Sequence, residues 1–410
     1  MSAPHKPPMK IGLFSALTAT ALLAGCAVGP DYQRPSSTLP EQYSQAEAQP
    51  AAPAEAPVNP EWWTLFGDAS LNALVAQALD ANQDLQAAIA RLEAADAYAR
   101  EINSAYYPTV NLDAASSRLG TSGTTYNGQK MGGAVYNNRR AALSLSYEID
   151  LWGRIRRMNE AAGADALASR FASDSVRLSL IGQVASEYLI LRSHDAEVAV
   201  SQETVNSRQE TLRIVKARLD AGSASALELA QAENLLASAQ SQLSQLKRLR
   251  GLSENQIGLL TGQPGLQIPV NLTPLPLPPV PPPGLPSSLL EARPDVRQAE
   301  EKLIAANARI GVAKAAYFPA ISLTGNYGSE SMALSSLFTA PATIWTAAIG
   351  LSMPIFDAGR TGARVDQATA GQKEMLANYR KTMQSAFKEV NDALVSLREL
   401  ADEETANIAQ

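Results

Sequence analysis

The chain of 410 residues contains an internal duplication. Residues 105–112 and 316–323, which lie 211 positions apart, each carry an aromatic pair, a proline and an alternating apolar segment. A second match, at an offset of 206, covers two further segments of each half, 142–146 with 348–352 and 153–154 with 359–360. Each half therefore predicts the order helix, strand, strand, helix. Repeats in membrane proteins commonly build a wall around a path, so the duplication disfavours a scaffold for one catalytic pocket.

The N-terminus has the pattern of a bacterial lipoprotein signal peptide. Two lysines precede an apolar run over residues 11–22, and the sequence Leu-Ala-Gly-Cys then ends at Cys26, the only cysteine of the chain. We predict a signal peptide over 1–25 and a lipid on Cys26, the first residue of the mature chain. The alternative is an ordinary signal peptide with a chance cysteine. Ala27 stands where lipoproteins retained in the inner membrane usually have aspartate, which favours the outer membrane.

Composition excludes several classes of protein. No other run reaches about 18 uncharged apolar residues, so the sequence predicts no membrane-spanning helix, and a bilayer crossing would have to use strands. The 40 acidic and 34 basic residues leave the chain mildly acidic, which offers nothing to nucleic acid. A single thiol leaves no disulfide framework and no zinc cluster.

Proline placement divides the chain. Ten of the 25 prolines lie in the first 60 residues and eleven lie in 264–294, whereas long stretches between them have none. The proline-free stretches predict long helices. We therefore expect a lipidated tether over 26–61, a first repeat over 62–268, an extended proline-rich connector over 269–286 and a second repeat over 287–410. A ligand for a proline-binding module is the alternative for the connector.

Two β-hairpins are predicted by alternation, over 108–152 and 319–356. In each strand one face is apolar and the other is polar or small, over about ten residues, a length that crosses a membrane when the strand is tilted. We expect the polar series of the second strand to face a water-filled lumen: Ser144, Ser146, Glu148 and Asp150. A soluble sandwich with half-buried strands is the alternative. Four strands cannot close a useful barrel, so several chains must contribute. The sequence does not decide between barrels of eight, twelve or sixteen strands.

Long helices follow the hairpins. The first is expected over 154–220, on the order of 100 Å long at about 1.5 Å per residue. Apolar residues recur in it every seven positions, as a coiled-coil seam requires. Gly222 ends this helix, and a second seam over 226–260 predicts its return. The second repeat begins another such helix at about residue 360.

Three separated motifs carry a resemblance to a known family. They are the residues around the lipidation site (23–32), the Trp-Trp-Thr-Leu-Phe segment (62–66) and the segment before the second repeat (285–296). Together they resemble outer-membrane factors of the TolC type, in the lipoprotein branch that serves resistance-nodulation-division efflux pumps.

The resemblance implies an α+β membrane protein that forms a homotrimer. Twelve strands would form one barrel in outer-membrane lipid, continued by a periplasmic α-helical barrel. The expected partners are a periplasmic adaptor protein and an inner-membrane resistance-nodulation-division transporter. Six residues match the first periplasmic tip, where the adaptor docks: Arg218, Leu219, Asp220, Ala221, Gly222 and Ser223. From the residues alone, this stretch predicts only a helix-ending turn.

The second repeat is expected to be truncated. If the offset of 206 continued, the counterpart of Gly222 would fall beyond Gln410, so the second tip and its return helix, about 60 residues by the repeat, would be missing. We expect these 410 residues to make a leaky or unassembled conduit. Normal drug resistance restored by this fragment in a strain lacking its own factor would contradict that expectation.

Signals of enzymatic activity are weak. Of the two histidines, His5 lies in the signal peptide and His194 on a helix, and the glycines near residue 120 precede no phosphate-binding turn. We expect no catalysis, no metal and no cofactor other than the lipid on Cys26. The predicted function is passive conduction from adaptor and transporter to the outside. A periplasmic adaptor and a structural coiled-coil lipoprotein are the alternatives.

Overall fold

The computed structural model describes residues 27–36, 39–40, 61–124, 133–274 and 292–409. Its contacts divide the chain into two compact units, each of which is discontinuous in sequence. The strand unit comprises Met1–Thr38, Glu93–Ala168 and Gln298–Gln384. The hairpin unit comprises Leu39–Leu92, Ser169–Arg297 and Ser385–Gln410. Cys26 and most of the proline-rich connector lie outside the described residues.

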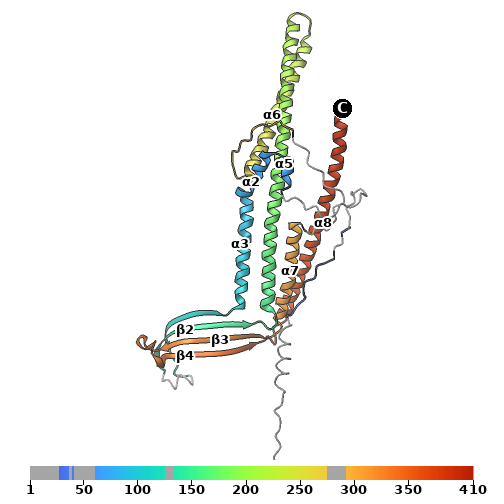
Figure 1. Ribbon diagram of the computed structural model, residues 1–410. Helices are drawn as coiled ribbons and strands as arrows, with labels where there is room; N and C mark the ends of the chain where they lie inside the picture. Colours follow the sequence, from blue (N-terminus) through green and yellow to red (C-terminus); the bar gives the residue numbers. More distant parts are fainter. Residues whose placement is uncertain (1–26, 37–38, 41–60, 125–132, 275–291, 410) are drawn as a thin grey trace, which may run out of the picture. The chain divides into compact units, whose positions relative to one another are not determined.

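The elements follow the duplicated order (Figure 1). The first repeat begins with a short 3-10 helix η1 (Trp62–Phe66) and helix α2 (Ala69–Ala81). It continues with α3 (Gln83–Asn103), β1 (Thr109–Gly120), β2 (Val135–Ile149), α5 (Arg154–Asp220) and α6 (Ala226–Leu260). The second consists of α7 (Pro294–Ala315), β3 (Ala320–Ser331), β4 (Thr343–Ser352) and α8 (Arg360–Ile408). None of the helices described combines the length and apolarity needed to cross a membrane.

The same turn leads from strand to helix in both repeats. Gly153 and Gly359 have φ angles of 78° and 84°, a left-handed conformation that glycine adopts without steric cost. An aspartate then caps each helix. Asp150 accepts hydrogen bonds from the backbone N–H groups of Ile155 and Arg156, and Asp357 accepts from that of Thr361. The duplicated sequence thus places the start of both helices by local chemistry.

The four strands form one antiparallel sheet in the order β1-β2-β3-β4. The register places side chains of like polarity opposite one another. Ser144, for example, pairs with Asn111 on one side and with Asn326 on the other. Leu143 pairs in the same way with Leu112 and Tyr327. Successive side chains of a strand point to opposite faces, so the sheet has one polar and one apolar face.

The strand bounds differ from expectation at two points. Asp150 lies beyond β2, which ends at Ile149, so the expectation that Asp150 belongs to the polar series of this strand is wrong. β4 ends at Ser352, four residues before the end of the predicted hairpin at 356. At Gly328 a Cβ atom would lie 2.3 Å from the carbonyl oxygen of Ala141, so this close strand pair needs glycine.

The start of the expected tether packs against the strand unit. The Val28 N–H donates to the carbonyl of Trp152 at 3.0 Å, and Asn307 of α7 donates to the carbonyl of Pro30 at 2.8 Å. Further along, Arg34 and Tyr32 both donate to Glu300 of α7. This segment has few apolar residues and is held mainly by hydrogen bonds. Its composition alone did not indicate these contacts.

The hairpin unit has an apolar core of its own. Helix α2 packs onto α5 and α6, and its Leu71 and Val75 are fully buried together with Val184, Leu191 and Ile257. Val184 and Leu191 belong to the predicted heptad seam.

Candidate functional site

The polar face of the sheet carries three of the four residues predicted to face a lumen. Ser146 lies between Thr109 and Thr324 in the register, and the Ser144 hydroxyl donates to Asp113 at 2.6 Å. Glu148 accepts two hydrogen bonds from Arg154, at 2.6 and 2.7 Å. Asp150 is engaged in capping α5 instead. The acidic groups are therefore paired, and most of the face is lined by short neutral side chains.

The apolar face of the same sheet is exposed. Leu112, Trp345 and Ile349 are 72, 74 and 71% exposed. A contiguous apolar surface of this kind marks contact with lipid or with another protein. Within the described part of the chain the outer edges of β1 and β4 have no strand beside them, and open edges leave backbone groups to be paired elsewhere.

Aromatic side chains gather where the strands meet the helices. The rings of Trp152 and Phe318 stack with their centroids 4.8 Å apart, and the indole N–H of Trp152 donates to the Pro319 carbonyl at 2.8 Å. Aromatic residues with one polar group are enriched at membrane–water interfaces. This end of the sheet therefore has the chemistry of an interfacial girdle.

The predicted tip is a tightly bonded turn between α5 and α6. Gly222 has a φ of 71°, and its N–H donates to Leu219 at 2.9 Å. The Ser223 N–H donates to Arg218 at 2.8 Å, which closes the helix in a Schellman motif. Ser225 then caps α6 in a capping box with Glu228.

Most of the tip is available for contact. Of the six predicted docking residues only Leu219 is partly buried; the other five are exposed: Arg218, Asp220, Ala221, Gly222 and Ser223. The turn is thus held by its own hydrogen bonds and presents a preformed surface, which lowers the conformational entropy lost on binding.

A buried polar network in the hairpin unit was not foreseen. Asp195, fully buried, accepts from Arg250 at 2.6 Å, while Asp68 accepts from Tyr188 and from Arg192, each at 2.8 Å. Burial alone would raise the pKa of Asp68, but the hydrogen bonds from Tyr188 and the backbone and the charge of Arg192 hold that pKa below its ordinary value. The signal in the sequence was Tyr188 and Asp195, which stand at the positions that partner the apolar seam.

This network holds the first residues of the connector and the residue just before it. Arg192 donates through Nε to the Asn271 carbonyl at 2.9 Å and through a second nitrogen to the Thr273 carbonyl, and Arg250 donates to Ile268 at 2.7 Å. Paired charges of this kind are structural, because Asp195 faces the guanidinium of Arg250 and Asp68 that of Arg192.

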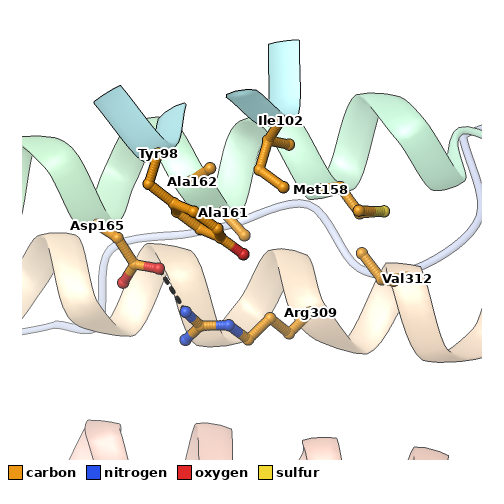
Figure 2. A pocket seen from close by; sticks show the side chains of 8 residues that line it. All are labelled: Tyr98, Ile102, Met158, Ala161, Ala162, Asp165, Arg309 and Val312. Atoms are coloured by element: carbon orange, nitrogen blue, oxygen red, sulfur yellow. Dashed lines mark hydrogen bonds and ion pairs between the residues drawn. The ribbon is translucent and has the colours of Figure 1, made fainter. Parts of the chain in front are cut away.

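A small hollow lies where α3, α5 and α7 meet in the strand unit (Figure 2). Its volume is about 120 Å³, and Figure 2 shows Tyr98 reaching into it from α3. Asp165 of α5 and Arg309 of α7 form an ion pair at its rim. Burial raises the pKa of Asp165, although Arg309 and Lys302 oppose the shift. The hollow is smaller than typical ligand sites of about 300–1,000 Å³.

No group of three or more His, Cys, Asp or Glu side chains that could hold a metal occurs among the residues with described positions. The strand unit instead presents a sheet with one apolar and one polar face, and the hairpin unit presents a helical hairpin with an exposed tip.

Comparison with known proteins agrees with this geometry. The family model of the outer membrane efflux protein matches residues 74–263 and 285–408. The chain is 34% identical over 389 residues to the cation efflux system protein CusC of Escherichia coli strain K12, covering 94% of this chain and 83% of that protein. It is 35% identical over 392 residues to the toluene efflux pump outer membrane protein TtgI of Pseudomonas putida, covering 92% and 81%.

A crystal structure of CusC superposes with a TM-score of 0.82 at 32% identity, over 93% of this chain and 85% of that one. The chain therefore belongs to the outer membrane efflux protein family. It is an outer-membrane component of an efflux pump of a Gram-negative bacterium and extends into the periplasm. The predicted family and function are confirmed over the alternatives of a periplasmic adaptor or a structural coiled-coil lipoprotein.

Proposed function

We propose that three copies of this chain form one passive conduit. Each copy contributes four strands to a twelve-stranded barrel and its long helices to a periplasmic tube. The observation that carries this proposal is the sheet, which is apolar and exposed on one face, polar on the other and open at both edges. Barrel closure between copies pairs both edges, and lipid covers the apolar face.

In this proposal the remaining parts serve attachment and docking. A signal peptide over 1–25 is removed, a lipid on Cys26 anchors the N-terminus, and residues 26–61 lead to the first repeat, 62–268. The second repeat, 287–410, follows the connector over 269–286. The tip over 218–223 binds a periplasmic adaptor, and its exposure in a preformed turn supports that role. Energy comes from an inner-membrane resistance-nodulation-division transporter, and the chain performs no catalysis.

Selectivity in such a conduit is coarse. Ser144 and Ser146 face a lumen lined mostly by short neutral side chains, which excludes little beyond bulk and strong charge. Two relatives are named for cations and for toluene, cargoes with no shared chemistry. We therefore assign the choice of cargo to the transporter.

Electron microscopy of the full-length gene product, extracted in detergent, tests the conduit. A three-fold tube with a detergent belt at one end and a long projection at the other is the expected result. Compact particles without a belt would rule out the barrel. Adaptor binding is tested separately, by pull-down with Asp220→Lys at the tip, for which we expect weaker capture and unchanged particles.

A further inference from the structure

The apolar face of the sheet becomes basic toward the ends of the strands far from the helices (Figure 1). In β2 the side chains on this face run from Ile149 to Ala141, and Arg139 is the next one. In β1 the same face carries Leu112 and, beyond it, Arg118. Successive side chains of a strand alternate between faces, so both arginines share the face of the exposed leucine. Two guanidinium groups therefore follow the surface assigned to lipid.

The position of Arg139 matches the border of a hydrocarbon layer. Arg139 lies ten residues from Ile149, which is about 34 Å along an antiparallel strand. At a strand tilt of about 40°, this length rises about 26 Å along the membrane normal, close to the apolar band of about 25 Å that membrane barrels present. Between these levels Tyr327 pairs with Trp345, and such exposed aromatic side chains are enriched at membrane–water interfaces. In the proposed barrel Arg139 therefore lies at the level of the lipid headgroups.

The basic charge on this face has no matching acid on the same face. The segments 114–147 and 323–356, which include the far ends of all four strands, contain four basic residues and one acid, Glu330. Glu330 pairs across the sheet with Arg140 on the polar face, where their charged groups lie 4.0 Å apart. Arg118 and Arg139 stand on the opposite face. Among the residues that the structure describes, neither of these two arginines has a carboxylate as an ion-pair partner.

The two arginines are placed to contact one anion together. Arg118 pairs with Asn137 in the register, so Arg139 is its diagonal neighbour on the same face. Diagonal side chains of an antiparallel pair start about 7–8 Å apart, within reach of long side chains. Arg139 donates through Nη1 to the Met332 carbonyl, which positions its guanidinium and leaves other N–H donors for a ligand. Two like charges at this distance repel, and an anion between them turns repulsion into attraction.

We propose that Arg118 and Arg139 bind a phosphate group of the glycolipid that forms the outer leaflet of the outer membrane. Guanidinium groups bind phosphate through paired, charge-assisted hydrogen bonds. The exposed Ser116 and Asn137 lie opposite the two arginines in the register and suit the sugar hydroxyls of such a headgroup. The inference rests on the proposed conduit, because it needs the apolar face to lie in lipid. It adds a lipid ligand of stated chemistry and the residues that hold it.

Lipid binding to the full-length gene product, extracted in detergent, tests this site. Diphosphoryl lipid A is added, and the bound lipid is measured by native mass spectrometry. R118Q/R139Q is expected to bind it about tenfold more weakly, because two charge-assisted contacts to phosphate are lost. R140Q removes the same charge from the adjacent residue on the polar face, so it is the matched control and should bind lipid A as the unaltered protein does.

Further variants and ligands sharpen the result. R118K/R139K keeps both charges but loses the paired donors, so it should bind about threefold more weakly. Arg118 is exposed, so R118Q alone should fold and should also bind about threefold more weakly even if the double variant fails to fold. Lipid A stripped of both phosphates should bind the unaltered protein and R118Q/R139Q equally. Inorganic phosphate should not displace lipid A at an equal concentration.

The outcomes separate this inference from the proposed conduit, provided that the same samples are imaged by electron microscopy. If three-fold belted tubes form but R118Q and R118Q/R139Q bind lipid A as tightly as the unaltered protein, the inference fails and the conduit stands. An equal loss in R140Q, or displacement by inorganic phosphate, would also overturn the lipid site. If the unaltered protein forms no such tubes, the conduit itself fails, and the lipid site fails with it.

Discussion

Apolar residues are buried in the core of the hairpin unit, whereas similar residues are exposed on the sheet of the strand unit. Leu71 and Leu191 are fully buried within one chain, whereas Leu112 and Ile349 are more than two-thirds exposed on the sheet. In the hairpin unit a buried charge also has its partner in the same unit, as Asp195 does with Arg250. The core of the hairpin unit is therefore covered within the described part of one chain, whereas the apolar face of the sheet is exposed and, in the proposed conduit, would be covered by lipid.

The largest effect on stability is expected from removing the acid of a buried ion pair in the hairpin unit. Asp195→Ala leaves Arg250 buried without its main acid and should lower the free energy of unfolding by about 3–5 kcal/mol. Asp220→Ala, which removes an exposed acid at the tip, should change it by less than about 0.5 kcal/mol. Chemical denaturation followed by circular dichroism measures both. Equal effects would contradict the structural role of the buried pair.

A charge introduced on the sheet distinguishes the apolar face from the polar face. Ile349→Arg places a guanidinium on the apolar face and should cost about 2–4 kcal/mol of folding free energy in lipid. Ala348→Arg, one residue away on the polar face, should be tolerated. Folding into vesicles, followed by gel mobility of unheated samples, compares them. If Ala348→Arg were the worse variant, the face assigned to lipid would be wrong.

A third prediction concerns pH. Because the pKa of Asp68 is lower in the folded state, its contribution to stability is present above its ordinary value and is lost as pH falls through the lowered one. Asp68→Asn should remove this part of the acid sensitivity of the hairpin unit. Thermal unfolding measured from pH 7 down to about pH 2 compares the pH dependence of stability in Asp68→Asn with that in the original chain, and Asp220→Asn is the control. An unchanged pH dependence in Asp68→Asn would contradict the prediction.

The smallest effect is expected at two glycines. Gly222→Ala forces a side chain into the left-handed region at the tip and should cost about 1 kcal/mol. Gly163→Ala lies within α5, where a Cβ meets no atom within 4 Å, and should stabilise by about 0.5–1 kcal/mol. Thermal unfolding distinguishes the two signs.

Local periodicity made the strands predictable. The alternation over 143–149 was enough to place Ser144 and Leu143 on opposite faces, because side chains of a strand alternate whatever its neighbours are. It did not show where β2 stops. Asp150 continues the alternating pattern, but the observed strand ends before it because its carboxylate caps α5, a competing local interaction.

Contacts between distant residues were beyond sequence alone. The pairing of Asp195 with Arg250 joins residues 55 positions apart, and the contact of Arg34 with Glu300 spans 266. Nothing in either local pattern names the other partner, since many charged residues have the same local surroundings.

The sequence by itself determined the duplication, the alternation of the strands, the heptad seam and the family, because each depends on spacing along the chain. Only the tertiary structure decided which alanines of the repeated helices are covered. Ala308 is buried and its counterpart Ala97 is exposed, although the two halves read alike there. Burial depends on what packs against a surface, and within the described part of the chain nothing covers Ala97.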